Sequence, residues 1–168
     1  MSRNVTMMAA IIIAVAALDQ AVKQFMLSWL SPGEAVPVVG NWFRLLLLFN
    51  PGAAFSLGGA GSTWLFTTMQ LLFVVGVAIA APRIKDRYQA IGLAMIAGGA
   101  LGNFIDRVAR EPGFWFGHVV DYISIGSFAV FNIADSFITV GVVVFIVALL
   151  TEERRGVREQ RDTNSSRS

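Results

Sequence analysis

Long apolar blocks alternate with short polar segments along the chain. Four of these blocks have the length of membrane spans, and we place them at about residues 5–27, 64–81, 89–106 and 130–150. A helix needs roughly 20 mostly apolar residues to cross the hydrocarbon core of a bilayer. Four such helices in a soluble protein would need amphipathic helices to cover them, and the chain has no room for these. The pattern therefore predicts a mainly α membrane protein with four transmembrane helices.

The composition agrees with one membrane domain. Of the 168 residues, 55% are hydrophobic and 14% are charged, and the mean hydropathy is +0.65. A soluble domain usually carries about 25% charged residues, so this chain has too few to cover its surface in water. We expect a single integral-membrane domain over residues 1–151 and a polar cytoplasmic tail without fixed structure over residues 152–168.

Scarce residue types exclude several kinds of chemistry. The chain has no cysteine and a single histidine, His118. Disulfides, thiol nucleophiles and cysteine-ligated zinc are therefore excluded, and one histidine does not build a multi-histidine metal centre. The formal net charge is only +2 and the basic residues are scattered, which argues against a nucleic-acid partner. We expect no metal and no cofactor.

The distribution of Lys and Arg predicts the orientation in the membrane. Basic residues precede the first span, separate the second from the third and follow the fourth: Arg3, Arg83, Lys85, Arg87, Arg154, Arg155, Arg158, Arg161 and Arg167. The other two loops hold only Arg44, Arg107 and Arg110. Cytoplasmic loops carry the excess of positive charge, so we expect both termini in the cytoplasm and the two long loops outside.

The first span has an alternative interpretation. Arg3 before an apolar run, with small residues at 14–17, also resembles a cleavable signal peptide. Asp19 and Lys23 follow at once and belong to the polar pattern described below, which favours an uncleaved span.

The outside loops contain β-prone runs. Val36–Val39 and Trp42–Phe49 lie between turn signals in the first loop, and His118–Ile125 lies in the second. They predict a small sheet on the outer membrane surface. A re-entrant or interfacial segment is the competing interpretation of the leucine run Leu45–Leu48.

Polar and ionisable residues gather at one predicted depth, the outer end of the spans. They are Asp19, Lys23, Asn50, Asn103, Asp106, Arg107, Asp121, Asn132 and Asp135. Ionisable side chains in apolar spans are costly and tend to mark a function, so we expect the chemistry in this layer. Structural interpretations exist for several of them. Asp19 and Lys23 have the spacing of an i,i+4 ion pair, and Asn132 has the position of a helix cap.

Asp121 is a candidate for a perturbed carboxyl group. In an extended segment it points the same way as Val119 and Ile123, so it lies in an apolar row. Desolvation raises the pKa of a carboxyl group, and a second carboxylate nearby favours one shared proton. Asp135 is the natural partner because a short segment leads from Asp121 back to the fourth span.

Five motifs follow one another along the chain. They are Asp19-Gln20-x-x-Lys23, Asn50-Pro51-Gly52-Ala53-Ala54-Phe55, Gly98-Gly99-Ala100-Leu101-Gly102-Asn103-x-x-Asp106-Arg107, Gly117-His118-Val119-Val120-Asp121-Tyr122 and Phe131-Asn132-x-Ala134-Asp135. With these motifs in this order, the chain resembles bacterial lipoprotein signal peptidase, also called signal peptidase II. The resemblance covers essentially the whole membrane part.

The resemblance implies a fold and an activity. The implied fold has four transmembrane helices, a small extracytoplasmic β-cradle and a surface helix. The implied activity is that of an intramembrane aspartic endopeptidase in the bacterial inner membrane, with its active site at the periplasmic face. Its substrate would be a diacylglyceryl-modified prolipoprotein, cut just before the lipidated cysteine. Membrane lipid is the other expected partner, and a monomer is the default expectation.

The resemblance also assigns roles to residues. Asp121 and Asp135 match the catalytic dyad, and the residues that match the lining of the active site are Asn103, Arg107 and Asn132. Supporting positions are matched by Asn50, Gly52, Asp106, Asp19 and Lys23. Gly52 is expected to permit a turn because glycine accepts positive φ without strain.

One segment departs from the family pattern. Residues 108–116 look longer than the usual connection, and their aromatic triplet is expected either in the lipid interface or beside the substrate groove. A plain surface turn is the simpler interpretation.

Other functions compete with the peptidase. A proton-coupled carrier would use intramembrane acids as a relay, but the inner halves of spans two to four hold no ionisable residue. A non-catalytic scaffold would need a packing face and no paired acids. Ser28 or Ser31 with Lys23 suggests a Ser–Lys protease, but we expect the substitution of both serines by alanine to be tolerated.

Overall fold

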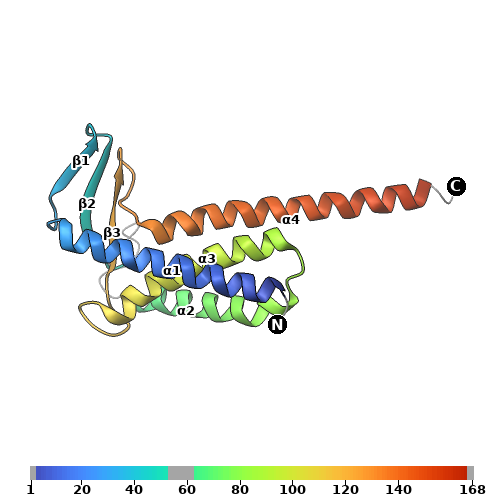
Figure 1. Cartoon of the computed structure of the whole chain (residues 1–168), viewed down its shortest axis with the longest axis horizontal. Helices are drawn as coiled ribbons and strands as arrows, with labels where there is room; N and C mark the ends of the chain where they lie inside the picture. Colours follow the sequence, from blue (N-terminus) through green and yellow to red (C-terminus); the bar gives the residue numbers. More distant parts are fainter. Residues whose placement is uncertain (1–2, 53–62, 166–168) are drawn as a thin grey trace.

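The computed structural model describes residues 3–52 and 63–165 of the chain. Four long helices run alongside one another, with a small sheet at one end of them (Figure 1). In chain order the elements are α1 (Arg3–Trp29), β1 (Ala35–Val39), β2 (Phe43–Asn50), α2 (Thr63–Ala80), the 3-10 helix η1 (Ala81–Arg83), α3 (Arg87–Ala109), β3 (Val119–Ile125) and α4 (Ile133–Ser165). The described residues thus contain four helices that are long and apolar enough to cross a membrane, which confirms the four predicted spans.

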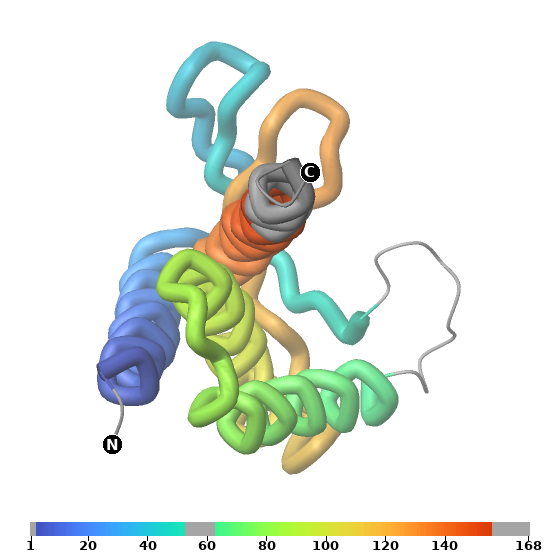
Figure 2. The backbone as a smooth tube through the Cα atoms, turned by 90° about the vertical axis from the view of Figure 1, so that its right-hand side faces the viewer, coloured from blue at the N-terminus to red at the C-terminus, as the bar shows by residue number. Residues whose placement is uncertain are grey.

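Helix α3 occupies the middle of the bundle, with α1, α2 and α4 around it (Figure 2). Its small residues allow this position, because Ala90, Ala94 and Ala97 are fully buried. Glycine brings α4 closest: a Cβ added at Gly99 would lie 2.4 Å from the carbonyl oxygen of Ala134. Small residues at helix interfaces let the backbones approach in this way, so the glycine run of the third span serves packing.

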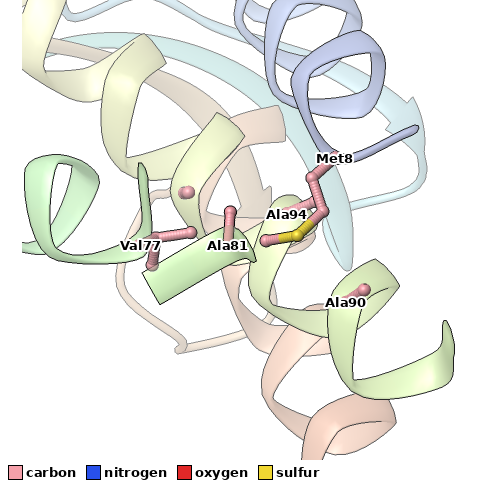
Figure 3. Close-up of a cluster of buried hydrophobic side chains, with 6 residues drawn as sticks. Met8, Val77, Ala81, Ala90 and Ala94 are labelled. Carbon is pink, nitrogen blue, oxygen red and sulfur yellow. The ribbon is translucent and has the colours of Figure 1, made fainter. Parts of the chain in front are cut away.

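At the end of the bundle away from the sheet, a small apolar core holds the helices together. Met8 of α1, Val77 of α2, Ala81 of η1 and three alanines of α3 pack together there (Figure 3). A polar contact reinforces it, because the side-chain amide of Asn4 donates to the carbonyl oxygen of Lys85 at 2.9 Å. The start of α1 is therefore fixed to the connection between α2 and α3.

The sheet is antiparallel and has the strand order β1-β2-β3. Its strands confirm the three β-prone runs predicted for the outside loops. The leucine run Leu45–Leu48 lies within β2, so its interpretation as a re-entrant segment is wrong. In the register between β2 and β3, Leu48 is opposite Asp121 and Asn50 is opposite Val119. The sheet therefore places Asn50 close to Asp121.

Helix α4 is longer than the fourth predicted span. It continues to Ser165, so residues 152–165, where we expect no fixed structure, are helical. Arg, Glu and Gln dominate this stretch and proline is missing from it, which suits a helix that continues into water. Both ends of the described chain lie at the end of the bundle away from the sheet (Figure 1). The described residues contain no surface helix of the kind that the resemblance implies.

Candidate active site

A tight turn after β3 brings Asp121 next to the start of α4. The backbone N of Ile123 donates to the carbonyl oxygen of Phe131 at 2.8 Å, and the N of Phe131 donates back to Ile123 at 3.0 Å. Helix α4 then begins at Ile133, so Asp135 lies in its first turn. The chain therefore returns to β3 immediately before the helix that carries the second carboxylate.

Asn132 joins the two carboxylates. Its Nδ2 donates to Oδ1 of Asp121 at 2.7 Å, and its Oδ1 accepts from the backbone N of Asp135 at 3.0 Å. In return, Oδ2 of Asp135 accepts from the backbone N of Asn132 at 3.1 Å. This reciprocal arrangement is a capping box, which satisfies free N–H groups at a helix start. Asn132 is therefore both the predicted helix cap and part of the site.

The environment of Asp121 favours its protonated form. The residue is only 2% exposed, and its Oδ2 accepts from Nδ2 of Asn50 at 2.8 Å. Burial raises the pKa of Asp121 from 3.8 to about 6, and the charge of Asp135 adds to this rise. The hydrogen bonds from Asn50 and Asn132 act in the opposite direction, and the bond from Asn50 is the stronger of the two effects. Asp135 is half-buried. The predicted desolvation of Asp121 is thus confirmed.

Asn103 of α3 holds the second carboxylate. Its Nδ2 donates to Oδ1 of Asp135 at 2.9 Å. Its Oδ1 accepts from Nζ of Lys23 at 2.8 Å and from Nδ2 of Asn132 at 3.1 Å. A lysine ammonium has three donors and no acceptor, so the amide oxygen must face Lys23 and the amide NH2 must face Asp135. Lys23 therefore fixes the direction of the Asn103 amide.

Lys23 is fully buried and its three donors are all in use. Besides Asn103, its Nζ contacts Oδ2 of Asp19 at 2.7 Å and Oδ2 of Asp106 at 2.8 Å. The predicted pair of Asp19 and Lys23 is confirmed and extended to a second carboxylate. This arrangement argues against a Ser–Lys protease, since Lys23 has no free donor and Oγ of Ser28 donates to the carbonyl oxygen of Phe25 at 2.7 Å.

Asp106 connects three elements around the site. Its Oδ1 accepts from Nε of Arg110 at 2.6 Å and from Nε2 of Gln20 at 3.0 Å. Its Oδ2 accepts from Lys23 and from the backbone N of Val120 at 3.1 Å. Asp106 therefore fixes the backbone of β3 directly beside Asp121.

Asp19 holds the start of α4 from the first helix. Its Oδ1 accepts from the backbone N of Ala134 at 3.1 Å. The approach depends on Gly102, because a Cβ there would lie 2.5 Å from Oδ2 of Asp19. The polar network thus positions α4, which carries Asp135, as well as β3.

Two residues of this network are missed by the sequence reasoning. Gln20 also donates to the carbonyl oxygen of Gly102 at 2.9 Å, and its place beside Asp19 in the first motif was the available signal. Arg110 follows Asp106 at the i,i+4 spacing of a helical acid–base pair, which was sufficient to find it.

Arg107 and Gly52 border the dyad. Arg107 is 4% exposed, its Nη1 donates to the carbonyl oxygen of Gly117 at 3.4 Å, and its Nε has no hydrogen-bond partner among the described residues. Its charge acts on Asp121 and Asp135. Gly52 has φ +109° and its N donates to Oδ1 of Asn50 at 2.8 Å, so the predicted turn is confirmed. The rest of that motif, residues 53–55, lies outside the described residues.

The segment 108–116 is partly anchored. Nε1 of Trp115 donates to Oγ1 of Thr68 at 3.3 Å, and Oγ1 of Thr67 donates to the carbonyl oxygen of Trp115 at 2.8 Å. Phe114 and Phe116 are exposed. Nearby lies a groove of about 670 Å³ lined by Phe49, Ala109, Arg110, Glu111, Pro112 and His118. The central tryptophan therefore packs onto α2, and its two neighbours face outwards.

The arrangement of motifs and helices matches a known family. A family model described as signal peptidase (SPase) II matches residues 11–151. The chain belongs to the signal peptidase II family. The lipoprotein signal peptidase of Rhodococcus jostii (strain RHA1) is 41% identical over 136 residues, which cover 81% of this chain and 68% of that protein. The lipoprotein signal peptidase of Mycobacterium avium (strain 104) is 39% identical over 145 residues, 86% of this chain and 79% of that protein.

A solved structure agrees with the fold of this signal peptidase II family member. A bacterial membrane enzyme determined at 2.3 Å superposes with a TM-score of 0.73 at 29% sequence identity, covering 88% of this chain and 90% of that one. These findings confirm the predicted resemblance and identify the chain as a peptidase.

Proposed function

We propose that this peptidase uses Asp121 and Asp135 as a catalytic dyad to remove the signal peptide from diacylglyceryl-modified prolipoproteins, cutting before the lipidated cysteine. One observation carries the proposal: the carboxylates lie on different elements, yet Asn132 binds both, because its side-chain Nδ2 donates to Asp121 and its backbone N donates to Asp135. An aspartic peptidase needs two carboxyl groups that share one proton at one water molecule.

The two carboxyl groups have complementary roles. The raised pKa of Asp121 favours a proton on this residue, and Asp135 then acts as the ionised partner. The ionised carboxylate accepts a proton from water as the water oxygen attacks the scissile carbonyl carbon. The protonated partner donates to the developing oxyanion, and a proton then passes to the nitrogen of the amine that leaves when the C–N bond breaks.

Other residues of the site hold the reactants. Asn103 directs an N–H to Asp135, and Asn50 directs one to Asp121. Arg107 is buried beside the dyad, and its Nε has no partner within the described residues. We assign to Arg107 a hydrogen bond to a backbone carbonyl of the substrate.

The proposed orientation places the dyad at the periplasmic face of the bacterial inner membrane. The basic loops and both chain ends lie at the opposite end of the bundle from the sheet (Figure 1). Because positive loops stay in the cytoplasm, this arrangement supports an outward sheet and a dyad at the outer rim of the bilayer.

The proton-coupled carrier has less support. Among the described side chains, those of residues 3–52 and 63–155, every ion pair belongs to the network around Asp106, at the sheet end of the bundle. A proton relay through the membrane would need ionisable groups along its depth. The family to which the chain belongs is one of peptidases.

Purified protein with a lipidated prolipoprotein tests the proposal. We expect Asp121→Asn and Asp135→Asn each to lower the rate of cleavage by at least about a thousandfold, because each removes one member of a proton-sharing pair. Helix content and melting temperature should change little, since the amide keeps the shape of the carboxyl group. Cleavage is measured by separating the released signal peptide on a gel.

Glu34→Gln is the matched control. Glu34 is an exposed carboxylate at the same end of the molecule, and its removal should leave cleavage unchanged. Full activity in either aspartate variant would exclude that residue from the dyad.

A further inference from the structure

A second groove lies at the opposite end of the bundle, between α4 and the beginning of α3. Its volume is about 670 Å³. Its apolar wall includes Val144 and Val147 of α4, and its rim includes Lys85, Tyr88 and Arg155. None of these residues belongs to the aspartate network, so the groove is a separate site.

The apolar and charged parts of this groove lie at different depths. The lining runs along α4 from Val143 to Arg155, which is about 18 Å at ~1.5 Å per residue. Val143 lies inside the fourth candidate span, whereas Arg155 is its last residue. A molecule that fills the groove must therefore have an apolar chain at the depth of the lipid tails and a polar group at the membrane surface.

The carboxylates within the groove already have donors. Asp86 accepts from the backbone N of Gln89 at 2.8 Å, and Glu152 accepts from Nε2 of the same residue. Among the residues that the structure describes, no carboxylate forms an ion pair with Lys85 or Arg155. The positive charges of Lys85 and Arg155 are therefore available to bind a ligand.

The surroundings of the groove are positive as well. The two bordering segments, residues 83–87 and 152–155, together carry five basic and three acidic side chains. Tyr88 is 65% exposed and adds a phenol hydroxyl at the same level. Tyrosine is enriched at membrane interfaces, where its ring is in contact with lipid and its hydroxyl with polar groups.

We propose that this groove binds an anionic phospholipid, with its phosphate between Lys85 and Arg155 and one acyl chain along Val144 and Val147. A zwitterionic lipid offers the same chain without the net negative charge. A helix of a second copy of this chain would fill the apolar wall but would leave the cations unpaired. The proposal does not depend on peptidase activity.

Retention of lipid by the purified full chain tests this site. Delipidated protein in detergent is mixed with phosphatidylglycerol or with phosphatidylcholine of the same chain length, and bound lipid is counted by native mass spectrometry. We expect a preference for phosphatidylglycerol. Lys85→Gln with Arg155→Gln should weaken its binding about twenty-five-fold, or fivefold for each charge, and leave the binding of phosphatidylcholine unchanged. Glu152→Gln should instead strengthen the binding of phosphatidylglycerol about fivefold.

Matched controls separate the groove from the general charge of the membrane surface. Arg83→Gln removes the same charge outside the groove lining and should leave the preference in place. Val147→Trp should fill the apolar wall and lower the binding of both lipids, whereas Val142→Trp is outside the lining and should lower neither. Melting curves without lipid identify any variant that fails to fold, and the gain expected for Glu152→Gln is measured independently of those losses.

Three results would overturn the proposal. The first is equal retention of both lipids by the unsubstituted protein, and the second is unchanged phosphatidylglycerol binding in the double variant. The third is efficient disulfide cross-linking of two Val147→Cys chains in a bilayer, which would show that a second copy covers the groove. Cross-linking is specific here because the chain has no cysteine of its own.

Discussion

The direction of the Asn103 amide depends on a cation that touches neither carboxylate of the dyad. Nζ of Lys23 has only donors, so the Asn103 oxygen faces it and the NH2 group faces Asp135. The opposite orientation would put two donors against each other at Lys23 and two acceptors against each other at Asp135. Lys23 therefore acts on the dyad through Asn103, in addition to binding Asp19 and Asp106.

Replacement of Lys23 tests its contribution to stability and to the site. We expect Lys23→Met to lower the free energy of unfolding by about 3–5 kcal/mol, because it leaves the buried Asp19 without a cation and leaves Asp106 with Arg110 alone. Cleavage should fall further than the folded fraction, since Asn103 is then free to reverse. Denaturation in detergent and the rate per folded molecule measure the two effects. Arg87→Met, at an exposed position, should change neither.

The pKa of Asp121 gives a prediction for pH. Because the active dyad holds one proton and the pKa is about 6, kcat/KM should fall as pH rises through this value. The hydrogen bond from Asn50 stabilises the ionised form and so lowers the pKa. Asn50→Leu should therefore move this limb of the pH profile to higher pH. If this limb does not move, a group other than Asp121 determines it. Asn41→Leu, in an exposed turn, is the control variant and should leave the pH profile unchanged.

The same shift affects stability with a definite sign. A carboxyl group whose pKa is higher in the folded than in the unfolded protein favours folding while it is protonated. The contribution of Asp121 is therefore fully present below pH 3.8 and is lost as pH rises through about 6.

At the scale of elements, the site depends on close approach between helices. Asp19 reaches the start of α4 because Gly102 has no side chain in its way. This approach brings α1, α3 and α4 together at one level. Each of these three helices contributes a polar side chain to the network, where it has polar partners in place of lipid.

Gly102→Ala tests this approach. The new Cβ would lie 2.5 Å from Oδ2 of Asp19, so we expect a loss of about 1–3 kcal/mol in the free energy of unfolding and a lower rate of cleavage. Gly76→Ala is the matched control, because its Cβ would meet nothing within 4 Å. Alanine is favoured over glycine inside helices by about 0.5–1 kcal/mol, so the control should be slightly more stable. Thermal melting of both variants in one detergent gives the comparison.

Helices and strands of this chain are largely predictable from the sequence, for physical reasons. Spans follow from length and hydropathy, and the strands from β-prone runs between turns. The closeness of Asp121 to the first turn of α4 follows from one short return of the chain. The contacts of Gln20 and the direction of the Asn103 amide do not follow, because hydrogen bonds between helices depend on how the helices rotate and pack. The polar composition of residues 152–165 predicts no fixed structure, whereas α4 continues through them.

For the whole molecule, the central question is which end faces which compartment. The excess of basic residues in the connection between α2 and α3 predicts that this end is cytoplasmic. The cysteine-free chain allows a direct test with single cysteines at two exposed positions, Asn41→Cys in the β1–β2 turn and Arg87→Cys at the start of α3. A membrane-impermeant thiol reagent should label position 41 in intact spheroplasts and position 87 only after lysis. The reverse pattern would place the dyad in the cytoplasm.

Helix α4 extends well beyond the other three helices (Figure 1). Its 33 residues span about 50 Å, whereas the hydrocarbon core of a bilayer is about 30 Å thick. Since Asp135 lies in its first turn, the far end of this helix extends past the hydrocarbon core at the end of the molecule opposite the two aspartates. A fluorescent dye attached there would follow rotation and diffusion of the peptidase in a living membrane without approaching the bond that is cut.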